Sequence, residues 1–167
     1  NFPLQVRTIT EGDELMMTIF GKHGLSDASR TTFAPYNWES EELAAEFTGS
    51  ISNSLAHRDL HLLAVDFDPS SLDGERVVAH AFLWSASDEV PELGIAVADD
   101  WHGRGIGRAM IWLLESAARV LGAPAIELTT MQGNTRAHAS YLAAGFLDLG
   151  IIRNPLGCDV TAAFQGT

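Results

Sequence analysis

The sequence predicts an α/β domain in which helices cover a mixed, mostly antiparallel β-sheet. Segments with helical periodicity alternate with short apolar segments typical of strands, in the order β, α, α, β, β, β, α, β, α, β, β. The chain has 167 residues, of which 46% are hydrophobic and 19% are charged, and this suits one domain with a substantial core. We therefore expect a single domain, residues 1–167, with about seven strands and about four helices.

The first predicted elements are a strand and a helix. Residues 5–10 alternate polar and apolar side chains, as a half-buried strand does. Thr10 and Asp13 have the spacing of a capping box, which predicts a helix that starts after Thr10. Because glycine commonly follows the last turn of a helix, we expect this helix to end at Gly21 and Gly24.

A long segment separates this helix from the next one. Residues 24–40 are polar with several aromatics, and they are predicted as a loop of the length that often carries function. Ser40 or Asn37 is expected to cap the second helix, which ends near Ala56. The apolar positions of that helix repeat at four-residue spacing, at Leu43, Phe47, Ile51 and Leu55.

The middle of the chain is predicted as an antiparallel meander of three strands. Apolar segments at 61–67, 76–84 and 92–98 are joined by turn-forming sequences. A glycine inside a strand often marks a β-bulge, so we expect a bulge near Gly94. The later elements are predicted as a helix that ends near Leu121, a strand at 125–131, a helix from Asn134 to Ala144, and strands at 146–153 and 159–164 around a turn.

The composition is strongly acidic. Asp and Glu number 22 against 10 Lys and Arg, which gives a formal net charge of −12. Such a surface repels nucleic acids and anionic membranes, so we expect neither as a partner. The same charge attracts cations and would suit an amine substrate, although it equally serves solubility.

Cysteine and histidine usage favours neither disulfides nor a metal. The one cysteine, Cys158, excludes an internal disulfide framework, and we expect a cytoplasmic protein. His57 and His61 are four residues apart but lack the following Glu of a zinc-protease motif, so no metal is expected. No segment approaches the ~18 apolar residues of a membrane span, and the first residues lack the pattern of a signal peptide.

Three glycines lie between the last strand of the meander and the helix after it, at Gly103, Gly105 and Gly107. Backbone N–H groups are unpaired at a helix start and the dipole there is positive, so bare glycines let an anion approach closely. The neighbouring side chains that add donors or positive charge are His102, Arg104 and Arg108. We expect a phosphate site, and the alternative is a turn that only packs the helix closely on the sheet.

Two common phosphate motifs do not fit this spacing. The dinucleotide fingerprint G-x-G-x-x-G fails because Arg108 or Met110 stands where its third glycine is required. The GK[ST] tripeptide of a P-loop occurs nowhere in the chain. A nucleotide-dependent enzyme of either type is therefore disfavoured.

Two segments resemble the GNAT N-acetyltransferase superfamily. Residues 92–118, ELGIAVADDWHGRGIGRAMIWLLESAA, resemble its acetyl-CoA signature, R/Q-x-x-G-x-G/A after an apolar strand. Residues 133–146, GNTRAHASYLAAGF, resemble its second landmark, an Asn followed seven residues later by Tyr and then by Gly-Phe. The resemblance spans residues 77–164 and implies a sheet splayed at its fourth strand, with acetyl-CoA in the gap. His102 departs from the family, which usually has Arg or Gln there.

The resemblance also implies roles for particular residues in acyl transfer from a thioester to an amine. Glu92 would be the general base, often acting through water, with His80 and Asp99 as weaker alternatives, and Tyr141 would protonate the leaving thiolate. On the residues alone, Glu92 could be a solvated strand end, Tyr141 a core residue and Asn134 only a helix cap. A backbone N–H near Ala96 or Val97 would bind the carbonyl oxygen. The implied acetyl-CoA-binding residues are Ile95, Ala96, Val97, His102, Gly103, Arg104, Gly105, Ile106, Gly107, Arg108, Asn134 and Tyr141.

The acceptor site is expected in the helix–loop–helix region, residues 24–60, where the family usually builds it. The substrate-binding candidates are Phe33, Tyr36 and Trp38, because aromatics beside carboxylates suit an ammonium group. The carboxylates of Glu39, Glu41 and Glu42 could equally be there to complement a helix dipole. Trp84, Trp101 and Trp112 are expected in the core or on the rim, and Cys158 is not expected to be a nucleophile.

These observations together predict an acetyl-CoA-dependent N-acetyltransferase that acts on a primary amine by direct attack in a ternary complex. The acceptor would be a small molecule or a peptide, and the protein could form a homodimer. The alternative function is a non-catalytic module that binds and senses acyl-CoA.

Overall fold

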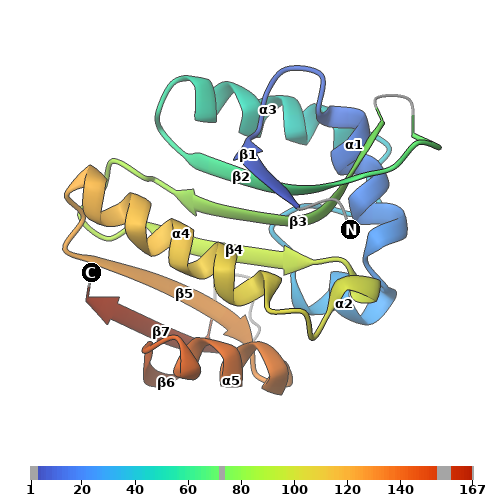
Figure 1. Cartoon of the computed structure of the whole chain (residues 1–167). Helices are drawn as coiled ribbons and strands as arrows, with labels where there is room; N and C mark the ends of the chain where they lie inside the picture. Colours follow the sequence, from blue (N-terminus) through green and yellow to red (C-terminus); the bar gives the residue numbers. More distant parts are fainter. Residues whose placement is uncertain (1–3, 72–73, 154–158, 167) are drawn as a thin grey trace.

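The computed structural model describes residues 4–71, 74–153 and 159–166, which form a seven-stranded sheet with helices on both faces (Figure 1). The strands are β1 (Gln5–Thr8), β2 (Leu60–Phe67), β3 (Glu75–Trp84), β4 (Glu92–Val97), β5 (Ala125–Met131), β6 (Leu147–Arg153) and β7 (Asp159–Gly166). Their order across the sheet is β1-β2-β3-β4-β5-β7-β6, and all neighbours are antiparallel except β4 and β5. The predicted mixed sheet and its meander are confirmed. The turn predicted at 154–157 and Cys158 lie outside the described residues.

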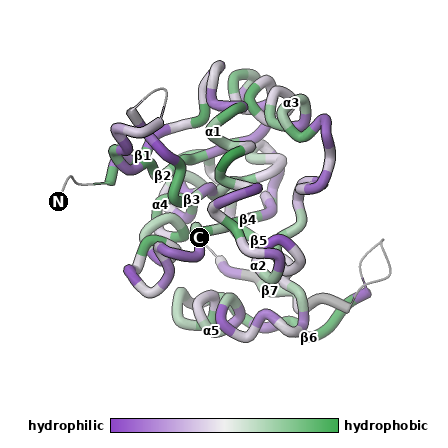
Figure 2. The backbone as a smooth tube through the Cα atoms, turned by 90° about the vertical axis from the view of Figure 1, so that its right-hand side faces the viewer, coloured by the Kyte–Doolittle hydropathy of each residue, from purple (hydrophilic) through white to green (hydrophobic). Residues whose placement is uncertain are grey.

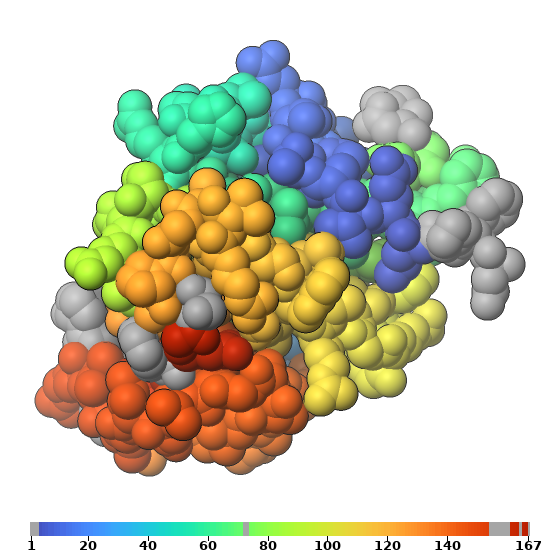
Figure 3. All heavy atoms as spheres, turned by 60° about the vertical axis from the view of Figure 1, so that its left-hand side comes forward, coloured from blue at the N-terminus to red at the C-terminus, as the bar shows by residue number. Residues whose placement is uncertain are grey.

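Two clusters of buried side chains lie on the two faces of the sheet. Helices α1 (Glu14–Ile19) and α3 (Leu43–Leu55) cover one face, and α1 continues as a π-helical turn over Phe20–Gly24. Helices α4 (Ile106–Leu121) and α5 (Thr135–Ala143) cover the other face. Figure 2 shows α1 and α3 at one end of the molecule and α5 with β6 at the other. In Figure 3, α4 (gold) lies between the N-terminal part (blue and teal) and the segment from α5 to β6 (orange to red).

Helix α4 shows why these sequences fold as they do. Its apolar stripe places Met110, Leu114 and Ala118 against the sheet, where each is almost fully buried. Gly122 ends the helix in the left-handed conformation, with φ +84°, as predicted from the glycine. Within the described residues, no helix combines the length and the apolar character needed to cross a bilayer.

A short helix, α2 (Asp27–Thr32), interrupts the segment 24–40 that was predicted as a loop. The Ser26 Oγ caps it by accepting a hydrogen bond from the backbone N–H of Ser29 at 3.3 Å. Arg30 donates hydrogen bonds to carbonyl groups of the preceding π-helical turn and so joins the two segments. The loop prediction was wrong because no residue of α2 is buried, and a helix without a buried stripe leaves no apolar periodicity in the sequence.

The start of α1 also differs from the predicted capping box. Asp13, and not Thr10, is the N-cap residue. The Asp13 carboxylate accepts a hydrogen bond from the backbone N–H of Thr10 at 2.7 Å and another from Nη1 of Arg7 at 2.7 Å. The Thr10 hydroxyl donates to the same carboxylate and therefore caps nothing. The carboxylate thus connects β1 to the start of the helix.

Of the two glycines predicted to end the first helix, Gly24 is confirmed, because the helical turns continue to it, and Gly21 is not, because it lies inside the π-helical turn. The ring of Trp38 packs against the Cα of Gly21, and a Cβ at that position would collide with the ring. Gly21 is therefore explained by a close contact between distant segments rather than by the end of a helix.

The predicted caps of α3 are also corrected. Glu42 is the N-cap residue and makes no side-chain capping bond. The Ser40 Oγ accepts a hydrogen bond from the backbone N–H of Glu42 at 3.0 Å, and Asn37 accepts one from the Ser40 N–H through its backbone oxygen at 2.9 Å. Ser40 and Asn37 therefore stabilise the turn before α3 instead of capping the helix.

Strands β4 and β5 pair at one position, the first residue of β4 and the third of β5, and then separate. Their register contains the single pair Glu92–Glu127, beside a hydrogen bond of 3.1 Å from the Glu127 N–H to the Pro91 oxygen. Further along, each strand pairs with its outer neighbour, β3 or β7. The second half of β4 therefore lies along a gap in the sheet.

The β-bulge expected near Gly94 does not occur in the pairing of β3 with β4. The register between these strands runs without a shift from Ala79–Val97 to Trp84–Glu92. Gly94 is required for another reason, because the Phe82 ring lies across it and would collide with a Cβ. The glycine thus reflects close packing on the neighbouring strand.

Candidate active site

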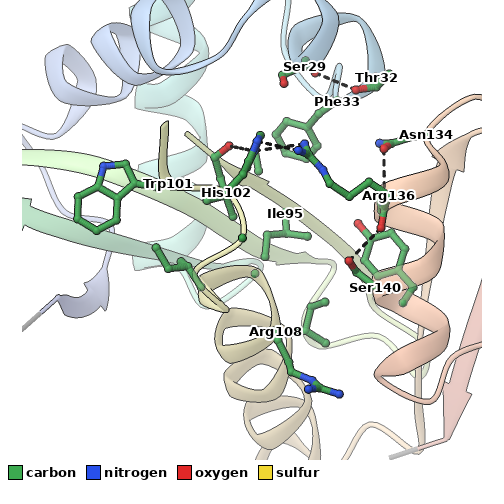
Figure 4. Close-up of a pocket in the computed structure, with 18 of the residues that line it drawn as sticks. Ser29, Thr32, Phe33, Ile95, Trp101, His102, Arg108, Asn134, Arg136 and Ser140 are labelled. Atoms are coloured by element: carbon green, nitrogen blue, oxygen red, sulfur yellow. Dashed lines mark hydrogen bonds between the residues drawn. The ribbon is translucent and has the colours of Figure 1, made fainter. Parts of the chain in front are cut away.

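A cavity of about 460 Å³ opens where β4 and β5 separate (Figure 4). Its walls come from α2, the second half of β4, the loop between β4 and α4, the first turns of α4, and α5. Of the residues expected to bind acetyl-CoA, all except Arg104 line this cavity. The fold therefore brings together two sequence segments, the glycine stretch and the segment from Asn134 to Tyr141, that are separated along the chain.

The glycine loop, residues 103–107, presents bare backbone to the cavity. Gly103 and Gly105 have φ values of +74° and +79°, a left-handed conformation that glycine adopts without strain. A Cβ on either residue would meet no atom within 4 Å, so the space beside this backbone is open. Gly105 is also the N-cap of the 16-residue helix α4, whose first N–H groups have no partner within the helix. This end of the cavity is therefore suited to an anion.

Two arginines add positive charge at the cavity. Arg108 on α4 and Arg136 on α5 both line it. In the part of the chain that the structure describes, neither forms an ion pair with a carboxylate, whereas Arg7, Arg30, Arg76 and Arg119 all do. The protein has 22 acidic residues and only 10 lysines and arginines, so two unneutralised guanidinium groups at one cavity indicate an anionic ligand.

Arg104 lies apart from this group. Its guanidinium carbon stacks 4.4 Å from the centre of the Trp101 ring, and its Nη2 donates a hydrogen bond to the Asp100 backbone oxygen at 3.1 Å. The structure therefore does not bring Arg104 into the cavity, although its neighbours in the glycine loop are there.

His102 is held by hydrogen bonds on both ring nitrogens. Its Nε2 lies 2.8 Å from the Val97 backbone oxygen, which can only accept, so Nε2 carries the proton. Nδ1 is then the acceptor for the Arg136 Nη1 at 2.8 Å. The Oδ1 of Asp99 is 3.9 Å from Nε2. The imidazole thus connects β4 with α5 across the cavity, as Figure 4 shows.

Tyr141 and Asn134 approach the cavity from α5. Tyr141 is 7% exposed, and burial raises the pKa of its phenol, which therefore stays protonated at neutral pH. The Oδ1 of Asn134 accepts a hydrogen bond from the backbone N–H of Ala137 at 3.3 Å, so Asn134 caps α5. Asn134 also lines the cavity, which means that its capping role and a ligand contact are compatible.

Glu92 is the first residue of β4 and lies outside the lining of the cavity, at the closed end of the gap. Its half-buried carboxylate accepts a hydrogen bond from the Thr129 hydroxyl at 3.4 Å. Burial raises the pKa of Glu92, the charge of Glu127 raises it further, and the Thr129 hydrogen bond opposes both. The carboxyl group is therefore a stronger base than an ordinary glutamate.

The two weaker candidates for a base have different environments. His80 is fully buried, its Nε2 lies 3.0 Å from the His61 Nδ1, and burial together with His61 holds the pKa of His80 well below its usual value. Burial would raise the pKa of Asp99, but hydrogen bonds from Ser26 and Ser29 outweigh it and lower the pKa. Neither residue lines the cavity. Among the described residues, no three His, Cys, Asp or Glu side chains are placed to hold a metal ion.

The three aromatic residues expected at the acceptor site separate in the structure. Phe33 lines the cavity, whereas Tyr36 and Trp38 are buried in the core with exposures of 7% and 4%. The Tyr36 hydroxyl is 3.2 Å from the Ser50 Oγ, and the Trp38 Nε1 donates a hydrogen bond to the Phe33 oxygen at 2.7 Å. Tyr36 and Trp38 therefore support the segment that carries Phe33. Glu39, Glu41 and Glu42 are exposed and do not line the cavity.

Several residues of the cavity were not predicted. Arg136 and Ser140, four residues apart on one face of α5, also line it. They lie five residues and one residue before Tyr141, so helical spacing from Tyr141 did not indicate them. Ser29 and Thr32 line it from α2, which was predicted as a loop, so no sequence signal pointed to them.

Comparison with known proteins agrees with this geometry. The model of the acetyltransferase (GNAT) family matches residues 25–146, from just before α2 to just before β6. No curated protein matches the chain in sequence. The family match therefore includes both the glycine loop and Tyr141.

Solved structures of low sequence identity share the fold over nearly the whole chain. The ribosomal-protein-S5-alanine acetyltransferase of Vibrio fischeri has a TM-score of 0.79 at 13% identity, covering 99% of this chain and 94% of that one. A ribosomal L7/L12 α-N-protein acetyltransferase in complex with coenzyme A has a TM-score of 0.79 at 12% identity, with 99% and 95% coverage. A chimeric spermidine N-acetyltransferase from Vibrio cholerae has a TM-score of 0.74 at 17% identity, with 98% and 95% coverage.

The splayed parallel pair β4–β5, the glycine loop at the start of α4 and the family match over residues 25–146 lead to one conclusion. The chain belongs to the acetyltransferase (GNAT) family and is a GNAT-family N-acetyltransferase.

Proposed function

We propose that this protein transfers the acetyl group of acetyl-CoA to a primary amine by direct attack in a ternary complex. The observation that carries the proposal is that one cavity is lined both by the glycine loop at the start of α4 and by Tyr141. The bare backbone of the glycine loop suits the diphosphate of CoA. The Tyr141 phenol suits protonation of the CoA sulfur, which leaves as a thiolate.

Strand β4 supplies the backbone groups that would hold the pantetheine arm. Beyond Glu92 it has no pairing with β5, so the backbone groups of Ile95 and Val97, which alternate with those directed at β3, face the gap. Both residues offer their N–H groups to a ligand, and Ile95 also offers its C=O. An amide-containing arm can occupy such an edge as an added strand would. Of the two expected donors, the Ala96 N–H is directed at β3, so the Val97 N–H would bind the carbonyl oxygen of the thioester, where negative charge develops during attack.

Glu92 is proposed as the general base. An alkylammonium group has a pKa of about 10.4 and is mostly protonated at neutral pH, so the acceptor must lose a proton before it attacks. Glu92 does not line the cavity and would take this proton through an intervening water. The raised pKa of Glu92 supports the role, because it brings the base closer to neutral pH.

Tyr141 is proposed as the general acid. It lines the cavity, and burial keeps its phenol protonated. The CoA thiolate would leave in the same apolar surroundings, which also raise the pKa of a thiol. The phenol can therefore donate first a hydrogen bond and then its proton to the sulfur.

The acceptor would approach along the part of the cavity formed by residues 24–60, with Phe33 as its aromatic wall. The structural neighbours named above act on ribosomal proteins or on spermidine, so both peptide amines and small polyamines are candidate acceptors. The net charge of −12 favours a cationic acceptor.

Calorimetric titration with acetyl-CoA, acetylpantetheine, NAD and ATP would test the proposal first. Micromolar binding that is selective for acetyl-CoA is expected, followed by thiol release when spermidine or a peptide with a free N-terminus is added. Failure to bind acetyl-CoA would overturn the proposal. Selective binding without turnover on any amine would indicate an acyl-CoA-sensing module instead of an enzyme.

A further inference from the structure

The Arg136 side chain crosses the cavity from α5 to the loop that precedes α4 (Figure 4). Its Nη1 lies 2.8 Å from the His102 Nδ1, and its Nη2 lies 3.3 Å from the His102 Nε2. A guanidinium has five N–H donors, and a neutral imidazole offers one acceptor. Most of the Arg136 donors therefore remain available to a ligand.

His102 fixes the position of this guanidinium. The bond from its Nε2 to the Val97 oxygen holds the ring against the end of β4 and directs Nδ1 toward α5. A neutral imidazole adds no positive charge to the glycine loop. The imidazole instead holds the Arg136 guanidinium, a cation from α5, beside Gly103, which follows His102 in the chain.

We propose that Arg136 is a binding residue for the diphosphate of acyl-CoA and that His102 is its positioning residue. The inference rests on the proposed function. The diphosphate at the glycine loop would lie at the start of α4, which carries Arg108, and beside the Arg136 guanidinium, which reaches the loop from α5. Arginine suits this role because its planar fork binds phosphate oxygens in pairs. A guanidinium that is already held in place loses less freedom when the ligand binds.

The test compares acetyl-CoA with acetylpantetheine, which lacks the diphosphate and the attached 3′-phosphoadenosine, and with acetyl-dephospho-CoA, which lacks only the 3′-phosphate. A loss shared by acetyl-CoA and acetyl-dephospho-CoA but absent for acetylpantetheine excludes the 3′-phosphate as its source and leaves the diphosphate as the anion involved. Calorimetry is carried out on the wild type and on Arg136→Gln, His102→Leu, the double variant and His102→Gln. Arg119→Gln is the matched control, because this exposed arginine pairs with Glu115 at 4.0 Å, away from the cavity.

Arg136→Gln should weaken acetyl-CoA binding by roughly 10- to 100-fold, the usual effect of a lost charged hydrogen bond, and should leave acetylpantetheine unchanged. His102→Leu should weaken acetyl-CoA binding by a smaller factor and have no further effect once Arg136 is replaced. His102→Gln should retain most of the affinity, since an amide can donate to Val97 and accept from Arg136. Arg119→Gln should match the wild type.

Three outcomes would overturn this inference alone, given a wild type that prefers acetyl-CoA. These are an unchanged preference in Arg136→Gln, an equal loss for acetyl-CoA and acetylpantetheine in that variant, or independent effects of the two substitutions. A wild type with no preference for acetyl-CoA over acetylpantetheine would instead overturn the proposed function. Arg136 is exposed, so its variant should fold even if a variant of His102 does not.

Discussion

Glu92 on β4 and Glu127 on β5 stand opposite each other in the one register pair between two parallel strands that then separate. The pairing places two carboxyl groups at the closed end of the gap. Burial raises the pKa of Glu92, and the negative charge of Glu127 adds to the effect. The same pairing that ends the contact between the strands therefore also tunes the proposed base.

Replacing Glu127 by Gln is expected to move the acid limb of the kcat/KM profile to lower pH. Glu92 accepts a proton only when it is ionised, so the rate falls as the pH drops through the raised pKa of Glu92. Removing the Glu127 charge removes one cause of that raised pKa. Measured pH profiles of Glu127→Gln, with the exposed Glu11→Gln as the control, test this expectation. A limb that does not move would contradict it.

Replacing Glu92 by Gln is expected to abolish the acid limb and to lower kcat by roughly 10²- to 10⁴-fold, the usual contribution of a general base. The affinity for acetyl-CoA should stay unchanged, because Glu92 does not line the cavity. Steady-state kinetics and calorimetry on the same preparation would check both statements. A Glu92→Gln variant that keeps the wild-type rate and profile would show that another group takes the proton.

Replacing Tyr141 by Phe is expected to lower kcat by roughly 10²-fold, because the leaving thiolate loses its proton donor. The dissociation constant of acetyl-CoA should change little, since the ring remains in place. Tyr36→Phe is the matched control, because the Tyr36 hydroxyl contacts Ser50 in the core and not the cavity. It should cost about 1 kcal/mol of stability and leave kcat unchanged. Equal rates for Tyr141→Phe and the wild type would remove Tyr141 from the mechanism.

Replacing Gly105 by Ala is expected to weaken acetyl-CoA binding through two effects. The left-handed backbone, with φ +79°, costs an alanine about 1–2 kcal/mol, and the new Cβ would enter the open space beside the glycine loop. Gly12→Ala is the control, since Gly12 has φ +96°, meets no atom within 4 Å and lies outside the cavity. Both variants should lose stability in urea unfolding, and only Gly105→Ala should lose affinity. Equal affinity of the two variants would argue against a ligand at the loop.

The buried pair His61 and His80 is expected to make the fold sensitive to acid. Burial lowers the pKa of His61 from 6.5 to about 4 and lowers that of His80 as well, so the folded protein binds fewer protons than the unfolded chain. Stability is therefore complete above pH 6.5 and is lost as the pH falls toward 4, by up to about 1.4 kcal/mol per pH unit for each ring. Urea unfolding between pH 7 and pH 5 should show this slope.

Exposed histidine His23 supplies the control for this measurement. His23→Gln should keep the wild-type slope, whereas His61→Asn should reduce it. A wild-type free energy of unfolding that stays constant from pH 7 to pH 5 would mean that the pair does not resist protonation in the folded state.

Local patterns in the sequence were sufficient for most elements of the fold and for one side of the cavity. The strands of the meander, helix α4 and the start of α5 follow from periodicity, glycine and the cap at Asn134, and the structure confirms them. The glycine loop was recognisable because its chemistry resides in the backbone of consecutive residues. Helix α2 was missed because it buries none of its residues and so leaves no periodic signal.

Contacts between segments far apart in the chain account for the rest. Periodicity indicates which side of an element is buried, but not which residue of another element it meets there. The contact of Arg136 with His102 across the cavity, the packing of Trp38 on Gly21 and the pairing of Glu92 with Glu127 are all of this kind. Each arises from how helices and strands pack against one another, and this packing is set by the whole core rather than by any one segment.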